Sequence, residues 1–155
     1  NLIEDTITVR IAPYGMVKDK NDKIWMLTSG GNNEELAKFV MYNPSSHTIE
    51  QILTFNSLTE SPSNLRIDEK RENLYFLNDG LQAMSILDTG IPVSKSISTN
   101  GSIFYGMNVD PYNKDVYITD AVDYVQQGKV YRYESIFQPL DPFVVGIIPQ
   151  RIRFK

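Results

Sequence analysis

Short apolar runs separated by polar turns fill this chain, and the runs repeat. The sequence YGMVKD at residues 14–19 recurs as YGMNVD at 105–110, and SNLRID at 63–68 fits the same frame. Each is followed by a polar turn and a short apolar run (IWML, LYFL or VYIT) whose second residue is aromatic. A further match joins residues 62–67 to 149–154. A repeat of about 42 to 49 residues fits the length of one four-stranded propeller blade.

Each unit divides into four short strands. We expect them at 13–18, 24–28, 36–42 and 48–55 in the first unit, at 63–67, 73–77, 81–87 and 92–98 in the second, and at 104–109, 115–119, 129–134 and 140–145 in the third. Asn, Asp, Gly, Pro and Ser separate the runs and supply turn geometry. A turn of helix is expected only at 34–39. The pattern predicts an all-β chain, a β-propeller fragment of about three four-stranded antiparallel blades.

Both ends of the chain are predicted to add one orphan strand each. Residues 2–11 alternate apolar positions like the outer strand of a preceding blade, and residues 148–155 match the inner strand of a following one. Residues 1–155 are therefore one propeller region, with blades at about 13–55, 63–98 and 104–145, and we expect it to belong to a larger ring. Open end blades would expose apolar faces and unpaired strand edges, so we expect self-association through them.

The second strand of each unit is apolar on both faces. A strand with that pattern is buried on both sides, as in a stack of blades. Trp25, Tyr75 and Tyr117, which occupy the same place in the three strands, are therefore predicted to be core between blades. The alternative is a row of aromatic rings that stack on a ligand.

The third unit carries a family resemblance. DPYNKDVYITD at residues 110–120, followed by GKVYRY at 128–133, resembles the YVTN-type, surface-layer-like β-propeller repeats of bacterial cell-envelope proteins. The ending GIIP at 146–149 resembles the closing strand of such propellers, and the resemblance extends from about residue 13 onward. It implies rings of about seven blades. It also implies an extracytoplasmic location, secreted or lipid-anchored as a lipoprotein, and family members largely of unassigned function.

Composition excludes several classes of function. The net charge is −4, and the basic residues form no patch, which argues against nucleic acid and anionic lipid as partners. The chain has no cysteine, so disulfides and thiolate chemistry are excluded. No apolar run is long enough to span a bilayer.

Catalytic and metal-binding signatures are weak. The one histidine, His47, lies in the turn before the fourth strand of the first unit and is predicted to be exposed and without a role in activity. Histidine-based zinc or iron sites therefore lack ligands. We predict no catalytic residue, no metal and no cofactor.

Carboxylates in the loops remain as candidates. Asp120 and Asp123 lie in the loop at 120–128, between the second and third strands of the third unit. Turn formation and backbone capping are the favoured roles for these carboxylates. Calcium binding, acid–base catalysis and ligand contact are the alternatives. Asp79, in Asn-Asp-Gly, is predicted to form a tight hairpin turn. Asn32 lies in a loop that is predicted to be a flexible connection, because it lacks the lysine of a phosphate-binding loop.

Blade geometry brings one set of loops to a common rim. The loops are 29–33, 78–80 and 120–128, and the connections between blades are 59–62, 99–104 and 146–149. We predict that any ligand site lies at this rim, because loops there vary without disturbing the sheets. The candidate ligand contacts are Tyr105, Asp120, Asp123, Tyr124, Asn32 and Asp79.

Two arginines occupy matching places in inner strands. Arg66 and Arg153 are each flanked by apolar residues, and pairing with an acid at the blade edge is favoured. The alternative is that they face the central channel and attract an anion.

A non-catalytic binding or interaction scaffold of the cell envelope is the function that the sequence favours, with a protein or a glycan as the ligand. The first alternative is a carbohydrate-active or other hydrolytic enzyme that uses loop carboxylates. The second is a purely structural half-propeller. The fold itself decides between none of them.

Overall fold

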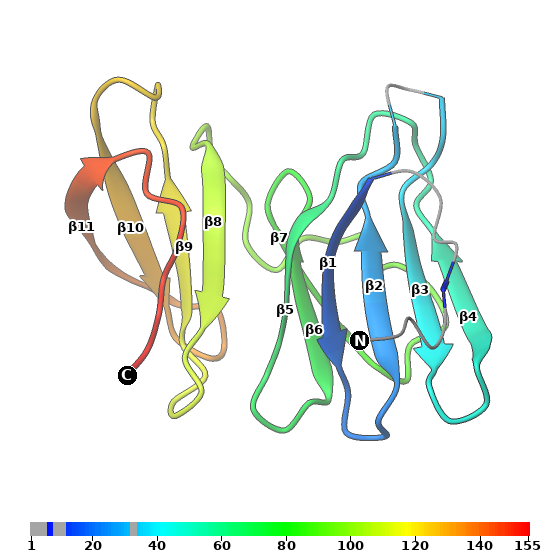
Figure 1. The fold of residues 1–155 in the computed structure, drawn as a ribbon. Helices are drawn as coiled ribbons and strands as arrows, with labels where there is room; N and C mark the ends of the chain where they lie inside the picture. Colours follow the sequence, from blue (N-terminus) through cyan, green and yellow to red (C-terminus); the bar gives the residue numbers. More distant parts are fainter. Residues whose placement is uncertain (1–5, 8–11, 32–33) are drawn as a thin grey trace.

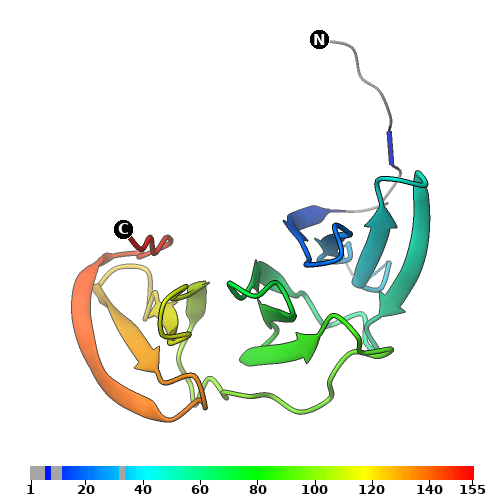
Figure 2. The same ribbon diagram turned by 90° about the horizontal axis from the view of Figure 1, so that it is seen from below.

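Three antiparallel sheets stand side by side in an arc in the computed structural model (Figures 1 and 2). The structure describes residues 6–7, 12–31 and 34–155. That part of the chain contains no helix, so the turn of helix predicted at 34–39 is wrong. Phe39 belongs to a strand instead, because alternate residues of this segment are buried between two blades.

The strand order within each sheet is that of a propeller blade. The first sheet runs β1 (Pro13–Lys18), β2 (Ile24–Thr28), β3 (Lys38–Asn43) and β4 (Thr48–Thr54). The second runs β5 (Ser63–Ile67), β6 (Asn73–Leu77) and β7 (Leu81–Ser85), and the third β8 (Phe104–Val109), β9 (Val116–Asp120), β10 (Gln127–Tyr133) and β11 (Pro139–Ile147). Sequential antiparallel pairing confirms the predicted fold class and most of the predicted strands.

The fourth strand of the second blade, predicted at 92–98, does not form. A single bridge between Leu81 and Ile97 stands in its place. Pro92 lacks the amide that a ladder needs, and its carbonyl accepts a hydrogen bond from the Gln82 side chain, at 2.6 Å. The outer edge of the second blade is therefore covered by a loop.

Two apolar clusters lie between neighbouring blades and hold the three blades together. Between the first and second blades, the Phe76 ring lies 5.1 Å from the Phe39 ring and 5.8 Å from the Phe55 ring, edge to face. On the other side of β6, Tyr75 joins a cluster with Met107 and other residues of the third blade. Neighbouring residues of β6 thus point into different clusters, which confirms the predicted burial on both faces.

Trp25 and Tyr117, the matching aromatic residues of the first and third blades, differ in burial. Trp25 is fully buried in the first cluster, as predicted. Tyr117 is only partly buried, and its ring packs against Phe154, with centroids 5.3 Å apart. Tyr117 therefore lies on the end face of the third blade and contacts the C-terminal segment.

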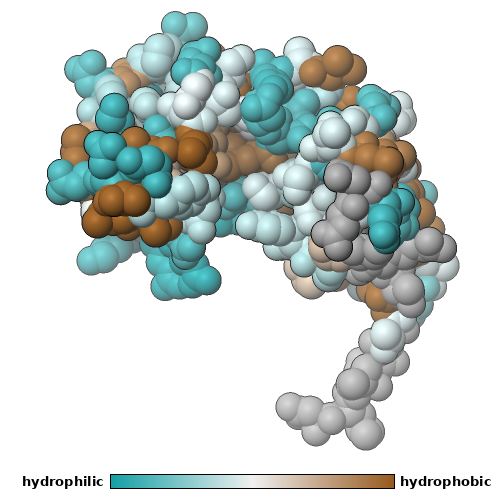
Figure 3. All heavy atoms as spheres, turned by 90° about the horizontal axis from the view of Figure 1, so that it is seen from above, coloured by the Kyte–Doolittle hydropathy of each residue, from teal (hydrophilic) through white to brown (hydrophobic). Residues whose placement is uncertain are grey.

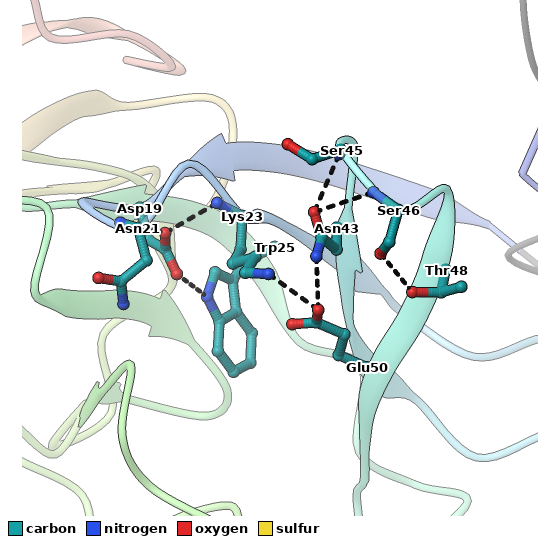
Figure 4. Close-up of polar contacts among 9 residues, drawn as sticks. All are labelled: Asp19, Asn21, Lys23, Trp25, Asn43, Ser45, Ser46, Thr48 and Glu50. Carbon is teal, nitrogen blue, oxygen red and sulfur yellow. Dashed lines mark hydrogen bonds and ion pairs between the residues drawn. The ribbon is translucent and has the colours of Figure 1, made fainter.

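The repeated aspartate after each inner strand builds the turn that follows. Asp19 is buried, and its carboxylate accepts hydrogen bonds from the backbone amides of Asn21 and Lys23 and from the indole N–H of Trp25, at 2.8, 2.9 and 3.0 Å (Figure 4). The neighbouring turn is organised in the same way, since the Asn43 side chain accepts the Ser45 amide and donates to Glu50. These aspartates fix the hairpins between the inner and second strands.

Acid should weaken the hairpin between β5 and β6, where Asp68 occupies the position that Asp19 has in the first blade. Burial disfavours the charged form of Asp68, but hydrogen bonds from Asn73 and from the backbone amide of Glu72 outweigh burial and lower the pKa of Asp68. A lowered pKa in the folded state adds stability above the unfolded value of about 4, and this stability is lost as the pH falls through the folded value. We expect Asp68→Asn to be less stable than wild type at neutral pH and to lose less stability on acidification.

Urea unfolding from about pH 7 to about pH 3 measures this. Glu69→Gln, at the exposed neighbouring position, is the matched control. If the free energy of unfolding changed with pH in the same way for wild type and Asp68→Asn, the proposed stabilising role of the Asp68 carboxylate would be contradicted.

The C-terminal segment lies against the end face of the third blade. Its carbonyl at Ile152 accepts a hydrogen bond from the Asn108 side chain at 3.0 Å, and Phe154 packs on Tyr117. Residues 148–155 form no strand ladder. The segment contacts the third blade through the side chains of Asn108 and Tyr117. The C-terminal segment therefore covers part of this end face.

The end face of the first blade is covered in part. Met26, Val40 and Tyr42 are buried there, and Ile7 packs against them. Most of the strand predicted at 2–11 lies outside the described residues. Self-association through the end blades stays a prediction.

Candidate functional site

A hollow of about 530 Å³ opens on the concave side of the arc. The inner strands β1, β5 and β8 lie on this side (Figure 2), and Figure 3 shows the arc from the opposite direction. The hollow is lined by residues from the first halves of these strands, from the preceding connection and from the C-terminal segment, namely Tyr14, Gly15, Ser61, Ser63, Asn64, Leu65, Arg66, Phe104, Tyr105, Gln150 and Arg151. The site thus combines all three blades.

An irregularity near the start of each inner strand shapes the hollow. The pairing register shifts between Pro13 and Gly15 in β1, between Ser63 and Arg66 in β5, and between Phe104 and Gly106 in β8. A bulge turns the side chain of an extra residue away from the regular alternation of a strand. The residues within these shifts include Tyr14, Asn64 and Tyr105, and all three line the hollow.

Tyr105 is held from three directions. Its ring meets the Tyr124 ring edge to face, with centroids 5.6 Å apart. Its hydroxyl accepts a hydrogen bond from the Gln150 side chain at 3.0 Å, and its carbonyl accepts one from the Asn64 side chain at 3.1 Å. The third blade, the second blade and the C-terminal segment therefore orient one aromatic wall of the hollow.

Arg66 and Arg151 bring positive charge to the same hollow. Arg66 is partly buried and donates a hydrogen bond to the Leu65 carbonyl at 2.7 Å. Burial, together with the nearby charge of Arg151, lowers the pKa of Arg66. Across the described chain Arg66 has no ion pair with a carboxylate, so the favoured prediction of an acid partner is wrong for this residue. Arg66 lines the hollow instead, and attraction of an anion there stays a prediction. Arg153 is exposed and does not line the hollow.

Asp120 and Asp123 stabilise their own loop, as favoured from the sequence. Buried Asp120 accepts the amides of Ile103 and Val122 at 3.0 and 2.8 Å. Asp123 accepts hydrogen bonds from the amides of Gln126 and Val125 and from the Gln126 side chain, and these bonds lower the pKa of Asp123. Neither carboxylate lines the hollow, and among the described residues no group of acidic or histidine side chains could hold a metal ion.

Asp79 lies at a second, smaller hollow between the second and third blades. This hollow measures about 290 Å³ and shares Ser61, Ser63 and Phe104 with the first. Asp79 has a positive φ of 48° in its tight turn and forms an ion pair with Lys95. The predicted hairpin turn is confirmed. The smaller hollow is lined by residues of the predicted loop 78–80 and connections 59–62 and 99–104, whereas the central hollow is lined mainly by inner strands.

The remaining predicted residues divide into three outcomes. Tyr105 lines the central hollow. Tyr124 does not line it, but its ring packs against the Tyr105 ring. Asn32 lies outside the described residues. Contact of any of them with a ligand stays a prediction. His47 is exposed in its turn, as predicted, and its Nδ1 lies 3.3 Å from the Tyr42 hydroxyl.

Sequence reasoning missed Tyr14 and Arg151. The signal for Tyr14 was present, because the Tyr-Gly pair at 14–15 recurs at 105–106 and places both tyrosines at a bulge. The repeat pointed to Arg153 in place of Arg151, because it aligned the C-terminal segment as a regular strand.

This chain is part of a β-propeller. Its strands form blades in sequential order, apolar clusters lie between the blades, and the inner strands line a hollow. No protein-family model matches it, and no curated protein matches it. Among solved structures it is similar to a quinonprotein alcohol dehydrogenase-like β-propeller protein from Bacteroides thetaiotaomicron, with a TM-score of 0.69 and 15% sequence identity.

That match covers 88% of this chain and 34% of the other protein, so the chain spans about a third of its length. At this identity the likeness shows the fold alone. The match supports a β-propeller fold and does not support membership of the YVTN-type repeat family. No helix that could cross a membrane occurs in the part of the chain that the structure describes.

Proposed function

We propose that this chain is a non-catalytic recognition part of a β-propeller, and that it binds a small hydroxylated ligand, such as a sugar unit, in the central hollow. The observation that carries the proposal is the repeated bulge, which places Tyr14, Asn64 and Tyr105 at one hollow. A regular inner strand would not direct these residues there.

The size and chemistry of the hollow support this proposal. A volume of about 530 Å³ lies within the range of small-molecule sites. Tyrosine rings, serine hydroxyls and amide side chains line it, and such groups offer both flat apolar faces and hydrogen bonds. The resemblance of residues 110–133 to envelope propellers supports an extracytoplasmic location as part of the same proposal.

The hydrolytic alternative finds no specific support. Glycoside hydrolysis needs two carboxyl groups that face one another across a substrate. Asp120 accepts the backbone amides of Val122 and Ile103, and Asp123 accepts two backbone amides of its own loop.

A printed array of neutral and acidic oligosaccharides tests the proposal. Binding that appears on the array is then measured by calorimetry for wild type and for Tyr14→Ala and Tyr105→Ala. We expect each variant to bind about tenfold more weakly or worse, since each loses one aromatic wall. Tyr112→Ala, at an exposed position away from the hollow, is the matched control.

Wild-type affinity in both hollow variants would contradict the proposed site. The absence of any binding on the array, to neutral and acidic sugars alike, would contradict the proposed function.

A further inference from the structure

The charge of the central hollow is opposite to that of the whole chain. The chain carries a net charge of −4, with 19 acidic residues against 15 lysines and arginines. Among the residues that the structure describes, the lining of the hollow contains two arginines and no acidic residue. This region of the described surface therefore favours a negative ligand, while the chain as a whole does not.

No carboxylate in the described part of the chain forms an ion pair with either arginine. Elsewhere in the described chain, Arg132 is paired with Asp115, and five lysines are paired with nearby carboxylates. Arg66 donates only to the carbonyl of its own neighbour, Leu65, which leaves further guanidinium N–H groups for another acceptor. A partly buried cation is stabilised when an anion reaches it.

Other groups beside the arginines complete a site for an oxyanion. Ser61, Ser63 and the hydroxyl groups of Tyr14 and Tyr105 are hydrogen-bond donors on the same lining. Gln150 belongs to the same segment as Arg151 and holds the Tyr105 hydroxyl. The second blade thus supplies one guanidinium and the C-terminal segment the other.

We propose that the group recognised in the central hollow is the oxyanion of a small organic acid or phosphate ester, bound between the guanidinium groups of Arg66 and Arg151. This inference rests on the proposed function and names the chemistry of its ligand. A carboxylated sugar and a sugar phosphate share the required anionic oxygens. Extended polyanions do not fit, because the described lining of the hollow presents two cations and the chain as a whole is acidic.

Calorimetric titration with matched sugars tests the inference. The probes are galacturonate, its neutral counterpart galactose, galactose 6-phosphate and inorganic phosphate. We expect galacturonate or galactose 6-phosphate to bind at least tenfold more tightly than galactose. Tighter binding of the first identifies a carboxylate as the natural group, and tighter binding of the second identifies a phosphate ester.

Two variants locate the contact. Arg66→Gln and Arg151→Gln should each weaken binding of the charged sugar at least tenfold more than binding of galactose, so that the preference for the charged sugar is lost. Arg66→Lys should retain part of the preference, because it keeps the charge and loses the planar fork. Arg71→Gln, an exposed arginine away from the hollow, is the control. Thermal melts of all variants verify folding, and Arg151→Gln, at an exposed position, keeps the test valid if Arg66→Gln fails to fold.

The outcomes separate the two proposals. Equal affinity for galactose, galacturonate and galactose 6-phosphate, lost in Tyr105→Ala, would overturn the oxyanion and leave the proposed function standing. A charged preference that survives both arginine variants would also overturn the inference. Failure of every probe to bind, together with an empty oligosaccharide array, would overturn both.

Discussion

Replacement of Phe76 by alanine is expected to lower the free energy of unfolding by about 3–5 kcal/mol. Phe76 is fully buried, and its ring meets those of Phe39 and Phe55 edge to face at the junction of the first two blades. Its removal leaves a cavity where two sheets meet, and neither sheet can move inward without disturbing its own strand ladder. We expect losses in the same range for Trp25→Ala and Tyr75→Ala.

Denaturant melts followed by far-ultraviolet circular dichroism measure these losses. Leu87→Ala removes an exposed apolar side chain and is expected to change stability little. Melting curves for Phe76→Ala, Trp25→Ala and Tyr75→Ala that superimpose on wild type would contradict the stacked-blade core.

Gly106→Ala is expected to displace the C-terminal segment and weaken the central site together. A Cβ atom at residue 106 would lie 2.3 Å from the Gln150 carbonyl oxygen and 2.9 Å from the Thr119 hydroxyl. The Gln150 backbone must therefore move, and Arg151 moves with it. We expect destabilisation of about 1–3 kcal/mol, typical of overpacking, and a loss of galacturonate binding similar to that of Arg151→Gln.

Limited trypsin digestion and calorimetry together test this prediction. Cleavage after Arg151 or Arg153 should be faster in Gly106→Ala than in wild type, because the segment is no longer held on β8. Gly90→Ala is the matched control, since a Cβ there meets nothing within 4 Å. Equal digestion rates and equal affinity in Gly106→Ala and wild type would show that the segment does not form a wall of the site.

Repetition made most of this fold predictable. The recurring inner strand and the apolar run after it set the blade length, and the strand bounds followed from the turns between them. The prediction failed at 92–98, where apolar residues alternate as in a strand but Pro92 interrupts the amide ladder. It also failed for 34–39, where a short segment gave no clear period and burial between blades decided the outcome.

The site was predictable only in part. Tyr105 and the connections 59–62 and 99–104, which contribute to the two hollows, are predictable because they depend on the order of strands. The bulges that direct Tyr14 and Asn64 into the hollow depend on pairing between strands, which the local pattern does not specify. Asp120 and Asp123 were candidates because carboxylates in loops can be free, and the structure shows them engaged by backbone amides.

The most direct measurement of recognition at the central hollow is nuclear magnetic resonance of the arginine side chains. The chain has six arginines, so their Nε–Hε signals can be resolved and assigned by substitution. On addition of galacturonate or galactose 6-phosphate, we expect the signals of Arg66 and Arg151 to shift in a saturable way. The signals of Arg71 and of Arg132, which is paired with Asp115, should stay in place. Saturable shifts confined to Arg71, Arg132 or Arg153, with Arg66 and Arg151 unmoved, would contradict recognition in the central hollow.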